Sequence, residues 1–304
     1  MITPALSRGL LQARRHHATG KDMDKLQWAG LDLSTPKVMG ILNVTPDSFS
    51  DGGSLVDAQA AIARGREMLA AGADILDVGG ESTRPGAAVI SADEEIARIL
   101  PVLRALAGEA VISVDTRNGA TMAAALEAGA RIINDVSGLR HDPKAAALVA
   151  AANCPVVLMH MRGSPMTMNC QAHYADVARE VLAELVAIRD AAEAAGVKPA
   201  NIALDPGLGF AKMGAQNLEL LRETWAFVAL GHPLVIGVSR KRFVGEFGEE
   251  PEAARRFPGS LAAGLYALNQ GAHILRVHDV GETVQGVKMW QQLTNGPAGS
   301  GKSL

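Results

Sequence analysis

The sequence predicts a single (β/α)8 barrel. Short runs rich in β-branched residues alternate with longer runs rich in Ala, Leu, Glu and Arg, eight times from Val38 onward. The short runs are continuously apolar, which is typical of parallel strands that are buried on both faces. The eight units occupy about 255 residues, close to the ~250 residues of such a barrel. A doubly wound open sheet is the alternative, but no glycine-rich dinucleotide turn follows the first strand.

The predicted elements alternate strictly, with a helix after each strand. The strands are expected at 38–43, 75–79, 111–115, 132–135, 155–159, 202–205, 233–237 and 274–277. The helices are expected to centre on 57–71, 92–107, 118–128, 143–151, 174–195, 217–229, 260–270 and 280–293. Ala-Gly-Ala at 71–73 and at 128–130 is typical of helix ends, because glycine readily adopts the left-handed conformation that follows a helix.

The composition excludes several classes of protein. The chain has 304 residues, a formal net charge of −3, 48% hydrophobic residues and 20% charged residues, which is ordinary for a globular protein. The near-neutral charge argues against nucleic-acid binding as the main role. The most apolar stretch, 145–161, is interrupted by Asn153 and Pro155, so no membrane span is predicted. The two cysteines form no CxxC motif, so we expect no disulfide scaffold and a cytoplasmic location.

Three segments are predicted along the chain. Residues 1–30 form an N-terminal extension that we expect to be mobile. A targeting segment is the alternative reading, although the extension lacks the apolar core of a secretory signal. Residues 31–294 form the barrel, and residues 295–304, rich in Gly, Ser and Pro, form a disordered tail.

Every predicted unit turns polar where its strand ends, which is where barrels of this class carry their active sites. One group of such residues is cationic and follows the last two strands: Ser239, Arg240, Lys241, Arg242, Arg276 and His278. Neighbouring strands bring these side chains together, so we expect them to bind a phosphate or diphosphate. A solvated basic rim is the alternative, and it is disfavoured because Arg276 and His278 share one face of their strand.

A second group combines carboxylates with an amide. Asp115, Asn134 and Asp205 end three other strands, and we expect their side chains to point into the barrel mouth. Such acceptors and donors suit a flat, nitrogen-rich heterocycle, with Lys241 donating to a ring carbonyl. The alternatives are a metal site, to which the set is a loose match, and helix N-caps, which Asp115 would also fit.

A third group consists of the two glycine-rich loops that follow the first two strands. Each loop carries small residues and one large side chain, Phe49 in the first and Arg84 in the second. We expect them to close over a bound ligand. Ordinary barrel loops are the alternative.

Eight motifs in this order and spacing resemble the dihydropteroate synthase family of folate biosynthesis. They lie at 40–53 (GILNVTPDSFSDGG), 77–86 (DVGGESTRPG), 113–116 (SVDT), 133–138 (INDVSG), 159–163 (MHMRG), 205–210 (DPGLGF), 239–242 (SRKR) and 276–279 (RVHD). The resemblance covers about residues 38–293 and neither end of the chain. A corrinoid methyltransferase barrel that binds methyltetrahydrofolate, and a non-catalytic paralogue that binds a pterin, are the rival hypotheses.

The resemblance implies a reaction and a set of site residues. The family joins 6-hydroxymethyl-7,8-dihydropterin diphosphate to 4-aminobenzoate, with Mg²⁺ as cofactor, and a homodimer is expected. It implies that Asp115, Lys241 and Arg276 are catalytic. It further implies pterin contacts from Asp115, Asn134, Asp205 and Lys241, a Mg²⁺ contact from Asn43, diphosphate contacts from Thr83, Arg276 and His278, and an aminobenzoate pocket built from Phe49, Arg84, Pro85, Ser239 and Arg242.

The chemistry that follows needs no protein nucleophile. Loss of diphosphate leaves a cationic pterin methylene, which a buried Asp115 is suited to stabilise before the aniline nitrogen attacks. Arg242 stands where the family often has Ser, and a guanidinium there would pair with the carboxylate of 4-aminobenzoate. Nothing in the loops suggests loss of sulfonamide sensitivity, so we expect inhibition by sulfonamides. His160 receives no role.

Overall fold

Eight parallel strands close into a barrel in the computed structural model, which describes residues 26–44, 54–82 and 90–295. The barrel strands of this part of the chain are β3 (Lys37–Asn43), β4 (Ile75–Gly79), β5 (Val111–Asp115), β6 (Ile132–Asp135), β7 (Val156–Met159), β8 (Ile202–Asp205), β9 (Val235–Ile236) and β10 (Ile274–Val277). Their order around the sheet is β8-β7-β6-β5-β4-β3-β10-β9. A parallel bridge between Leu204 and Leu234 joins the two ends. The predicted fold class is therefore confirmed.

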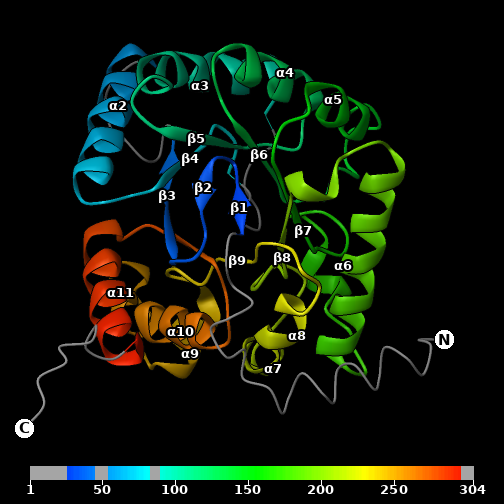
Figure 1. The fold of residues 1–304 in the computed structure, drawn as a ribbon, viewed down its shortest axis with the longest axis vertical. Coiled ribbons are helices and arrows are strands. Elements are labelled where there is room, and N and C mark those ends of the chain that lie inside the picture. Colours follow the sequence, from blue (N-terminus) through cyan, green and yellow to red (C-terminus); the bar gives the residue numbers. More distant parts are fainter. Residues whose placement is uncertain (1–25, 45–53, 83–89, 296–304) are drawn as a thin grey trace, which may run out of the picture.

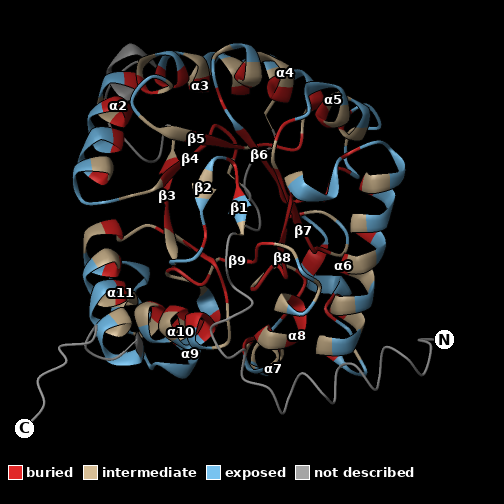
Figure 2. Ribbon diagram, viewed as in Figure 1, coloured by how far each residue is buried: buried red, intermediate tan, exposed pale blue. Residues whose placement is uncertain are grey.

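The helices form a ring outside the strands (Figure 1). In the described segments they are α2 (Ser54–Ala70), α3 (Ala92–Leu106), α4 (Gly119–Glu127), α5 (Ala145–Ala152), α6 (Val177–Ala194), α7 (Ala215–Arg222), α8 (Thr224–Val228), α9 (Arg242–Phe247), α10 (Phe257–Asn269) and α11 (Val280–Asn295), with 3-10 turns at Met168–Gln171, Pro199–Asn201 and Ala253–Arg255. Figure 2 shows the expected burial pattern, with buried strands inside and exposed outer helix faces. Apolar side chains between the two layers form the main core.

Some element boundaries differ from the prediction for identifiable reasons. The helix predicted at 174–195 begins only at Val177, because the Asp176 carboxylate accepts a hydrogen bond from the backbone N–H of Arg179 and caps the helix there. The helix predicted at 217–229 is two helices that meet at Glu223. The strand predicted at 233–237 covers only Val235–Ile236, and its late start reflects Pro233, which has no N–H to donate to a ladder.

A β-hairpin closes the amino-terminal end of the barrel. Its strands are β1 (Gln27–Trp28) and β2 (Leu31–Asp32), and its turn residues Ala29 and Gly30 both have positive φ. Trp28 is 2% exposed, and its indole N–H donates to the carbonyl of Asn201 at 2.9 Å. The sequence predicts that residues 27–30 belong to a mobile extension. This prediction is wrong, because strands of two residues leave no periodic signal and their burial depends on the finished barrel.

The inside of the barrel changes character along its axis. At the hairpin end, one apolar side chain from almost every strand belongs to the same buried cluster as Trp28: Met39, Ile75, Ile132, Val157, Ala203, Val235 and Ile274. At the carboxyl ends of the strands the inward side chains are polar or charged. The apolar end supplies stability, and the polar end is left for chemistry.

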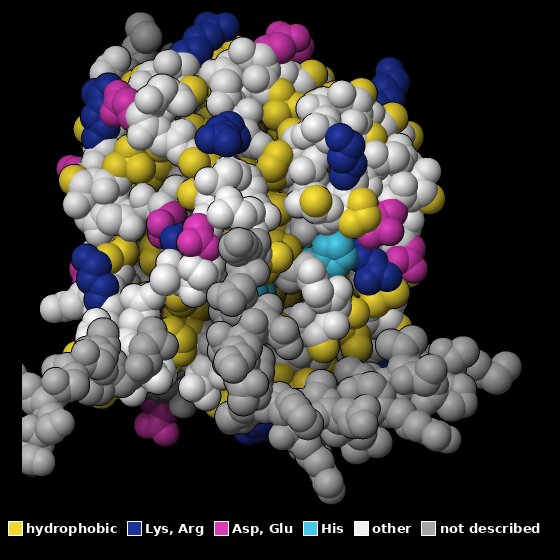
Figure 3. Space-filling model, viewed as in Figure 1, with side chains coloured by type: hydrophobic (Ala, Val, Ile, Leu, Met, Phe, Trp, Pro, Cys, Tyr) yellow, Lys and Arg dark blue, Asp and Glu magenta, His cyan; other side chains and the backbone are white. Residues whose placement is uncertain are grey.

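The outer surface shows no strong charge bias on the hairpin side. In Figure 3, the described Lys and Arg side chains on this face are scattered, and several lie beside Asp or Glu. Among the described residues, no helix is both long enough and apolar enough to cross a membrane.

Candidate active site at the carboxyl ends of the strands

A row of polar residues crosses neighbouring strands on the inner face. The β-ladder pairs Asn43 with Gly79, Gly79 with Asp115, and Asp115 with Asn134. Residues paired in this way point to the same face of a sheet. Asp77, two residues before Gly79, lies one layer deeper on the same face and is completely buried. The strand register therefore brings together the predicted Asn43, Asp115 and Asn134, and adds Asp77.

Arg276 on β10 holds the two buried carboxylates of this row. Its Nε donates to Asp77 at 2.6 Å, and its terminal NH2 group donates to Asp115 at 2.6 Å. Asn134 also donates to Asp77, at 3.0 Å. Burial opposes the charged guanidinium, but the two carboxylates outweigh it and raise the pKa of Arg276. Arg276 is thus a fixed positive charge inside the barrel mouth.

The Asp115 carboxyl group can be either ionised or protonated near neutral pH. Burial raises the pKa of Asp115 to about 7; Arg276 opposes this shift, and the neighbouring charge of Asp77 adds to it. One carboxylate oxygen of Asp77 and one of Asp115 are buried and have no hydrogen-bond partner among the described residues. Since buried acceptors are normally satisfied, these two oxygens call for N–H or O–H donors from a ligand or from water.

Asp205 and Lys241 face the same space from β8 and from the start of α9. The Asp205 carboxylate accepts from the backbone N–H of Gly207 at 2.7 Å, and burial raises its pKa. Lys241 donates to the carbonyl of Leu208 at 2.6 Å, and its Nζ lies 4.1 Å from the ring centroid of Phe210. Burial lowers the pKa of Lys241 to about 8, against the opposing attraction of Asp205.

The loops after β9 and β10 place Ser239 beside His278. The Ser239 hydroxyl accepts from the backbone N–H of His278 at 3.1 Å and lies 3.0 Å from its Nδ1. Arg240 does not join the predicted cationic group, because its guanidinium pairs with Asp279. Arg242 is exposed as the first residue of α9.

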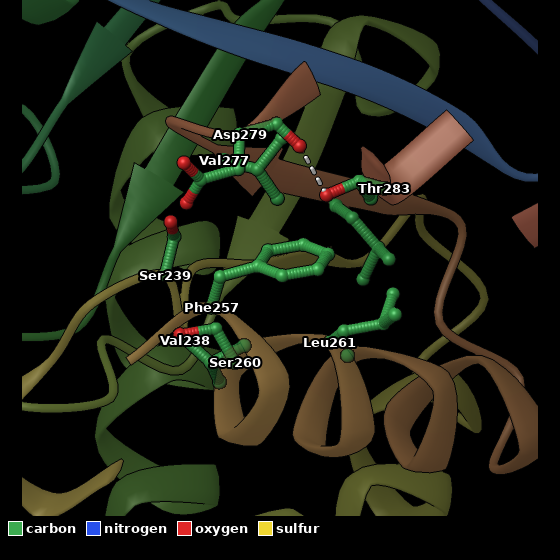
Figure 4. A pocket seen from close by; sticks show the side chains of 10 residues that line it. Val238, Ser239, Phe257, Ser260, Leu261, Val277, Asp279 and Thr283 are labelled. Atoms are coloured by element: carbon green, nitrogen blue, oxygen red, sulfur yellow. Dashed lines mark hydrogen bonds between the residues drawn. The ribbon is translucent and has the colours of Figure 1, made fainter. Parts of the chain in front are cut away.

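A small cavity lies behind Ser239, on the outer side of the barrel (Figure 4). Ser239 and Asp279 lie at one end, and the Thr283 hydroxyl donates to the Asp279 carbonyl at 2.6 Å. The remaining lining is apolar apart from Ser260: Val238, Phe257, Leu261, Gly264, Leu275 and Val277. This cavity is separate from the polar row, which faces the barrel interior.

Comparison with known proteins identifies the family to which this chain belongs. The family model described as "Pterin binding enzyme" matches residues 39–278. The dihydropteroate synthase of Neisseria meningitidis serogroup C is 47% identical over 267 residues, which cover 86% of this chain and 94% of that protein. The Escherichia coli K12 dihydropteroate synthase is 46% identical over 268 residues, which cover 86% and 93%. The chain belongs to the dihydropteroate synthase family.

Solved structures of the family share the barrel. The Xanthomonas albilineans dihydropteroate synthase with 4-aminobenzoic acid has a TM-score of 0.83 at 46% identity, and covers 88% of this chain and 97% of its own. The same enzyme in complex with 7,8-dihydropteroate gives 0.80 at 43%, with the same coverage. The Yersinia pestis dihydropteroate synthase in a sulfonamide drug complex gives 0.82 at 42%, again covering 88% and 97%.

The structure brings most of the residues singled out by the family resemblance to one end of the barrel. Asn43, Asp115, Asn134, Asp205, Ser239, Lys241, Arg276 and His278 all lie at or just after the carboxyl ends of strands, and Arg242 begins the next helix. Phe49, Thr83, Arg84 and Pro85 lie outside the described residues, so their predicted roles remain predictions.

Sequence reasoning missed Asp77, although a signal was present. Asp77 is a lone carboxylate inside an otherwise apolar strand, and burial of an acid without a partner is costly, so a cationic neighbour could have been expected. It also missed the buried ion pair of Arg117 and Glu81, joined by hydrogen bonds of 2.9 and 3.1 Å. Both residues stood inside or beside the family's motifs, but no pattern in the sequence linked them.

The side chains of this site offer an oxygen that would suit a magnesium ion bound mainly to substrate phosphates. No group of three His, Cys, Asp or Glu side chains within the described ranges could hold a metal by itself. Mg²⁺ commonly keeps several waters and takes only one or two protein oxygens in addition to substrate phosphates. The half-buried Asn43 amide, at the end of β3, offers one such oxygen.

Proposed function

We infer that this protein joins 6-hydroxymethyl-7,8-dihydropterin diphosphate to 4-aminobenzoate. The C–O bond between the pterin methylene and the diphosphate breaks, a C–N bond to the aniline nitrogen forms, and the aniline nitrogen loses one proton. The products are 7,8-dihydropteroate, pyrophosphate and that proton. The observation that carries this inference is the pair of unpartnered carboxylate oxygens on Asp77 and Asp115 beside Arg276, in a chain closely similar to dihydropteroate synthases.

The pterin ring would lie over the polar row. Its ring N–H and amino groups are donors, which the carboxylates of Asp115 and Asp205 can accept. Asn134 can both donate and accept, and Lys241 can donate to the ring carbonyl. The Phe210 ring, held close to Lys241, offers an apolar face at the edge of this pocket.

The diphosphate would lie toward β10, against Arg276 and His278, with Thr83 as the predicted third contact. Arg276 already carries the positive charge that a leaving diphosphate requires. Asn43 would hold the Mg²⁺ ion, which when bound supplies further positive charge to the diphosphate oxygens.

The protein promotes leaving-group loss mainly through placed charges. Negative charge grows on the diphosphate beside Arg276, while positive charge grows on the methylene carbon, where an ionised Asp115 lowers its energy. The neutral aniline nitrogen then attacks, so the protein has to hold the two substrates in line and exclude water. We therefore propose Asp115, Lys241 and Arg276 as the catalytic residues.

The aminobenzoate pocket is proposed around Ser239 and Arg242, with Phe49, Arg84 and Pro85 contributed by the two loops. Arg242 is exposed at the start of α9, so its guanidinium is accessible to an anion. The carboxylate of 4-aminobenzoate would pair with this guanidinium. A sulfonamide would then compete for the same position.

We also propose that the protein is a cytoplasmic homodimer. Tyr266 on α10 and Met289 and Leu293 on α11 are large apolar side chains exposed on neighbouring helices. Such a face is suited to pairing with a second copy of the chain. Light scattering of the purified protein tests this, and a monomeric mass at micromolar concentration would refute it.

Pyrophosphate release tests the proposed reaction. Purified protein receives the pterin diphosphate and Mg²⁺, with or without 4-aminobenzoate. We expect release only with 4-aminobenzoate, inhibition by a sulfonamide, and loss of release in Arg276→Gln. Arg66→Gln, at an exposed pair with Glu109, is the matched control. Tight pterin binding without release would instead favour a non-catalytic paralogue or a methyltransferase barrel, and methyltetrahydrofolate would be tested next.

A further inference from the structure

A polar cluster of two buried and two partly exposed side chains lies outside the barrel lumen, behind β7 and β8. Lys212 and His160 are 3% and 0% exposed. His160 directly follows β7, and its ring points away from the lumen toward Glu184 on α6, which lies 2.9 Å from His160 Nε2. Arg162 holds the same carboxylate, with its Nε 3.0 Å from one oxygen of Glu184 and 3.1 Å from the other. None of these four side chains has a role in the proposed reaction.

The amino group of Lys212 is surrounded by acceptors. Its Nζ lies 2.9 Å from Nδ1 of His160, 3.2 Å from the His160 carbonyl, 3.0 Å from the Gly207 carbonyl and 2.8 Å from the Phe210 carbonyl. Its contacts therefore connect the end of β7 to two points of the loop after β8. A lysine held in this way restrains the backbone, because the contacts with the three carbonyl oxygens fix the directions of those groups.

The protons of the cluster can be assigned. The hydrogen bond from His160 and the Arg162 guanidinium keep the pKa of Glu184 at about 2 despite its partial burial, so Glu184 is a carboxylate. Burial lowers the pKa of His160 to about 4, so the ring is neutral near pH 7. The single ring proton then lies on Nε2, facing Glu184, and Nδ1 presents a lone pair to Lys212. Burial lowers the pKa of Lys212 well below its usual value. All four partners of its amino group are acceptors, and a group with at most three protons cannot donate separately to each of them.

The clamped loop carries the groups that hold Lys241. The carbonyl oxygens of Gly207 and Phe210 accept hydrogen bonds from Lys212. The carbonyl oxygen of Leu208, which lies between them in the chain, instead accepts from the Nζ of Lys241 at 2.6 Å. The Phe210 ring also contacts the Lys241 ammonium. The loop 206–210 is thus hydrogen-bonded to two lysines on opposite sides. Lys212 lies behind the barrel, and Lys241 lies in the lumen.

The backbone of this loop leaves little room for adjustment. Gly207 and Gly209 have φ of 68° and 80°, the left-handed region that favours glycine. A Cβ at position 207 would overlap the His160 carbonyl oxygen, and one at position 209 would lie 2.9 Å from the Lys241 side chain. The approach of the loop to both lysines is therefore close, so displacement at one side is transmitted to the other.

We propose that Lys212 is a positioning residue for the pterin pocket. It does not touch substrate; it fixes the loop 206–210 against His160, so that the Leu208 carbonyl and the Phe210 ring hold Lys241 in place for the ring carbonyl of the pterin. This proposal rests on the proposed function for the identity of the ligand. The loss caused by removing Lys212 should therefore run through Lys241.

A double-mutant cycle tests this route. The variants are Lys212→Met, Lys241→Met and the double variant, with the exposed Lys198→Met as a control for loss of a lysine amino group. The measurements are Kd for the pterin diphosphate by calorimetry, KM for 4-aminobenzoate, and Tm. We expect Lys212→Met to raise the pterin Kd by about 10-fold or more and the KM for 4-aminobenzoate by less than about 3-fold. In the Lys241→Met background, Lys212→Met should change the pterin Kd by less than about 3-fold.

Several results would overturn the proposal. Single effects on Kd that multiply in the double variant would show that Lys212 acts independently of Lys241. A lower Tm with an unchanged pterin Kd would show that Lys212 only stabilises the fold. If Lys212→Met does not fold, Lys212→Gln, which keeps a donor but has a shorter side chain, enters the same cycle. Pterin Kd is measured without turnover, so failure of the proposed reaction and failure of this proposal are distinguishable.

Discussion

Replacing Asp77 with asparagine probes the buried charge network at its deepest point. Asp77→Asn keeps the shape of the side chain but removes its charge and changes one acceptor into a donor. The carboxylate accepts from Arg276 at 2.6 Å and from Asn134 at 3.0 Å, and it is completely buried. Both hydrogen bonds go to the same oxygen, Oδ2, whereas Oδ1 has no partner, so the amide oxygen of the variant can still accept both of them but without the negative charge.

The expected cost in stability follows from these contacts. A hydrogen bond to a charged group contributes about 1.5–3 kcal/mol, and breaking a buried ion pair costs about 3–5 kcal/mol. Asp115 still pairs with Arg276 in the variant, so we expect a loss of about 2–4 kcal/mol in the free energy of unfolding. For a domain of this size, that loss corresponds to a Tm lower by roughly 4–16 °C.

The same change alters the pH dependence of the reaction in a direction that can be worked out. Asp77 raises the pKa of Asp115, which lies at about 7, and Arg276 lowers it. Without the charge of Asp77, Arg276 acts mainly on Asp115, so Asp115 ionises at lower pH. If ionised Asp115 stabilises the pterin methylene, the acid limb of kcat/KM should lie near pH 7 in the natural protein and at lower pH in Asp77→Asn.

Differential scanning calorimetry and pH–rate profiles measure the two effects. Asp93→Asn, at an exposed position in the first turn of α3, controls for loss of an aspartate charge and should change Tm by little. The reasoning is refuted if Asp77→Asn leaves Tm within the range of the control, or if its acid limb moves to higher pH.

Four other perturbations have definite expected outcomes. Trp28→Ala should lower the free energy of unfolding in denaturant by about 3–5 kcal/mol, because it leaves a cavity at the hairpin end of the barrel; a loss below about 1 kcal/mol would contradict a stabilising role of this side chain. Glu81→Gln should cost about 3 kcal/mol by leaving Arg117 buried without its charge partner, whereas Glu109→Gln at an exposed pair should cost under about 1 kcal/mol; equal costs would refute the difference. Since the pKa of Lys241 is about 8, pterin affinity should fall as pH rises through 8, and a flat profile from pH 7 to 9 would exclude the ammonium. Chelation of Mg²⁺ should abolish turnover reversibly but leave the Tm of the free protein unchanged, and a lowered Tm would indicate a resident structural metal.

The sequence was sufficient for the barrel because its signal is repeated and local. Each buried strand is a continuous apolar run, and each boundary with a helix changes the residue pattern. The same logic placed Asp115 and Asn134 correctly at strand ends. It could not show that Asp115 pairs with Asn134, because the register of two neighbouring strands is not written in either one. Nor could it show that Arg276 reaches Asp77, since the first and last parts of the barrel meet only when the ring closes.

The residues whose roles the sequence could not predict share one physical feature. Arg240 looked like its neighbours in the sequence, but a positive φ of 58° at this residue and the nearby Asp279 direct its guanidinium elsewhere. His160 could not be assigned because its partners, Glu184 and Lys212, come from a helix and a loop with no motif in common. Side-chain direction in loops is a property of the assembled tertiary structure.

The hairpin at the barrel floor has a consequence for how the chain acquires its structure during synthesis. Trp28 precedes all eight barrel strands, yet its binding surface includes Ile274 from the last of them. Its hydrogen bond to Asn201 spans 173 positions. The described segment that leaves the ribosome first must therefore wait for nearly the whole chain before it can dock, and contacts of such long range are formed late and slowly. Until then the indole has no buried site to occupy, so burial of Trp28 marks the point at which the barrel has closed.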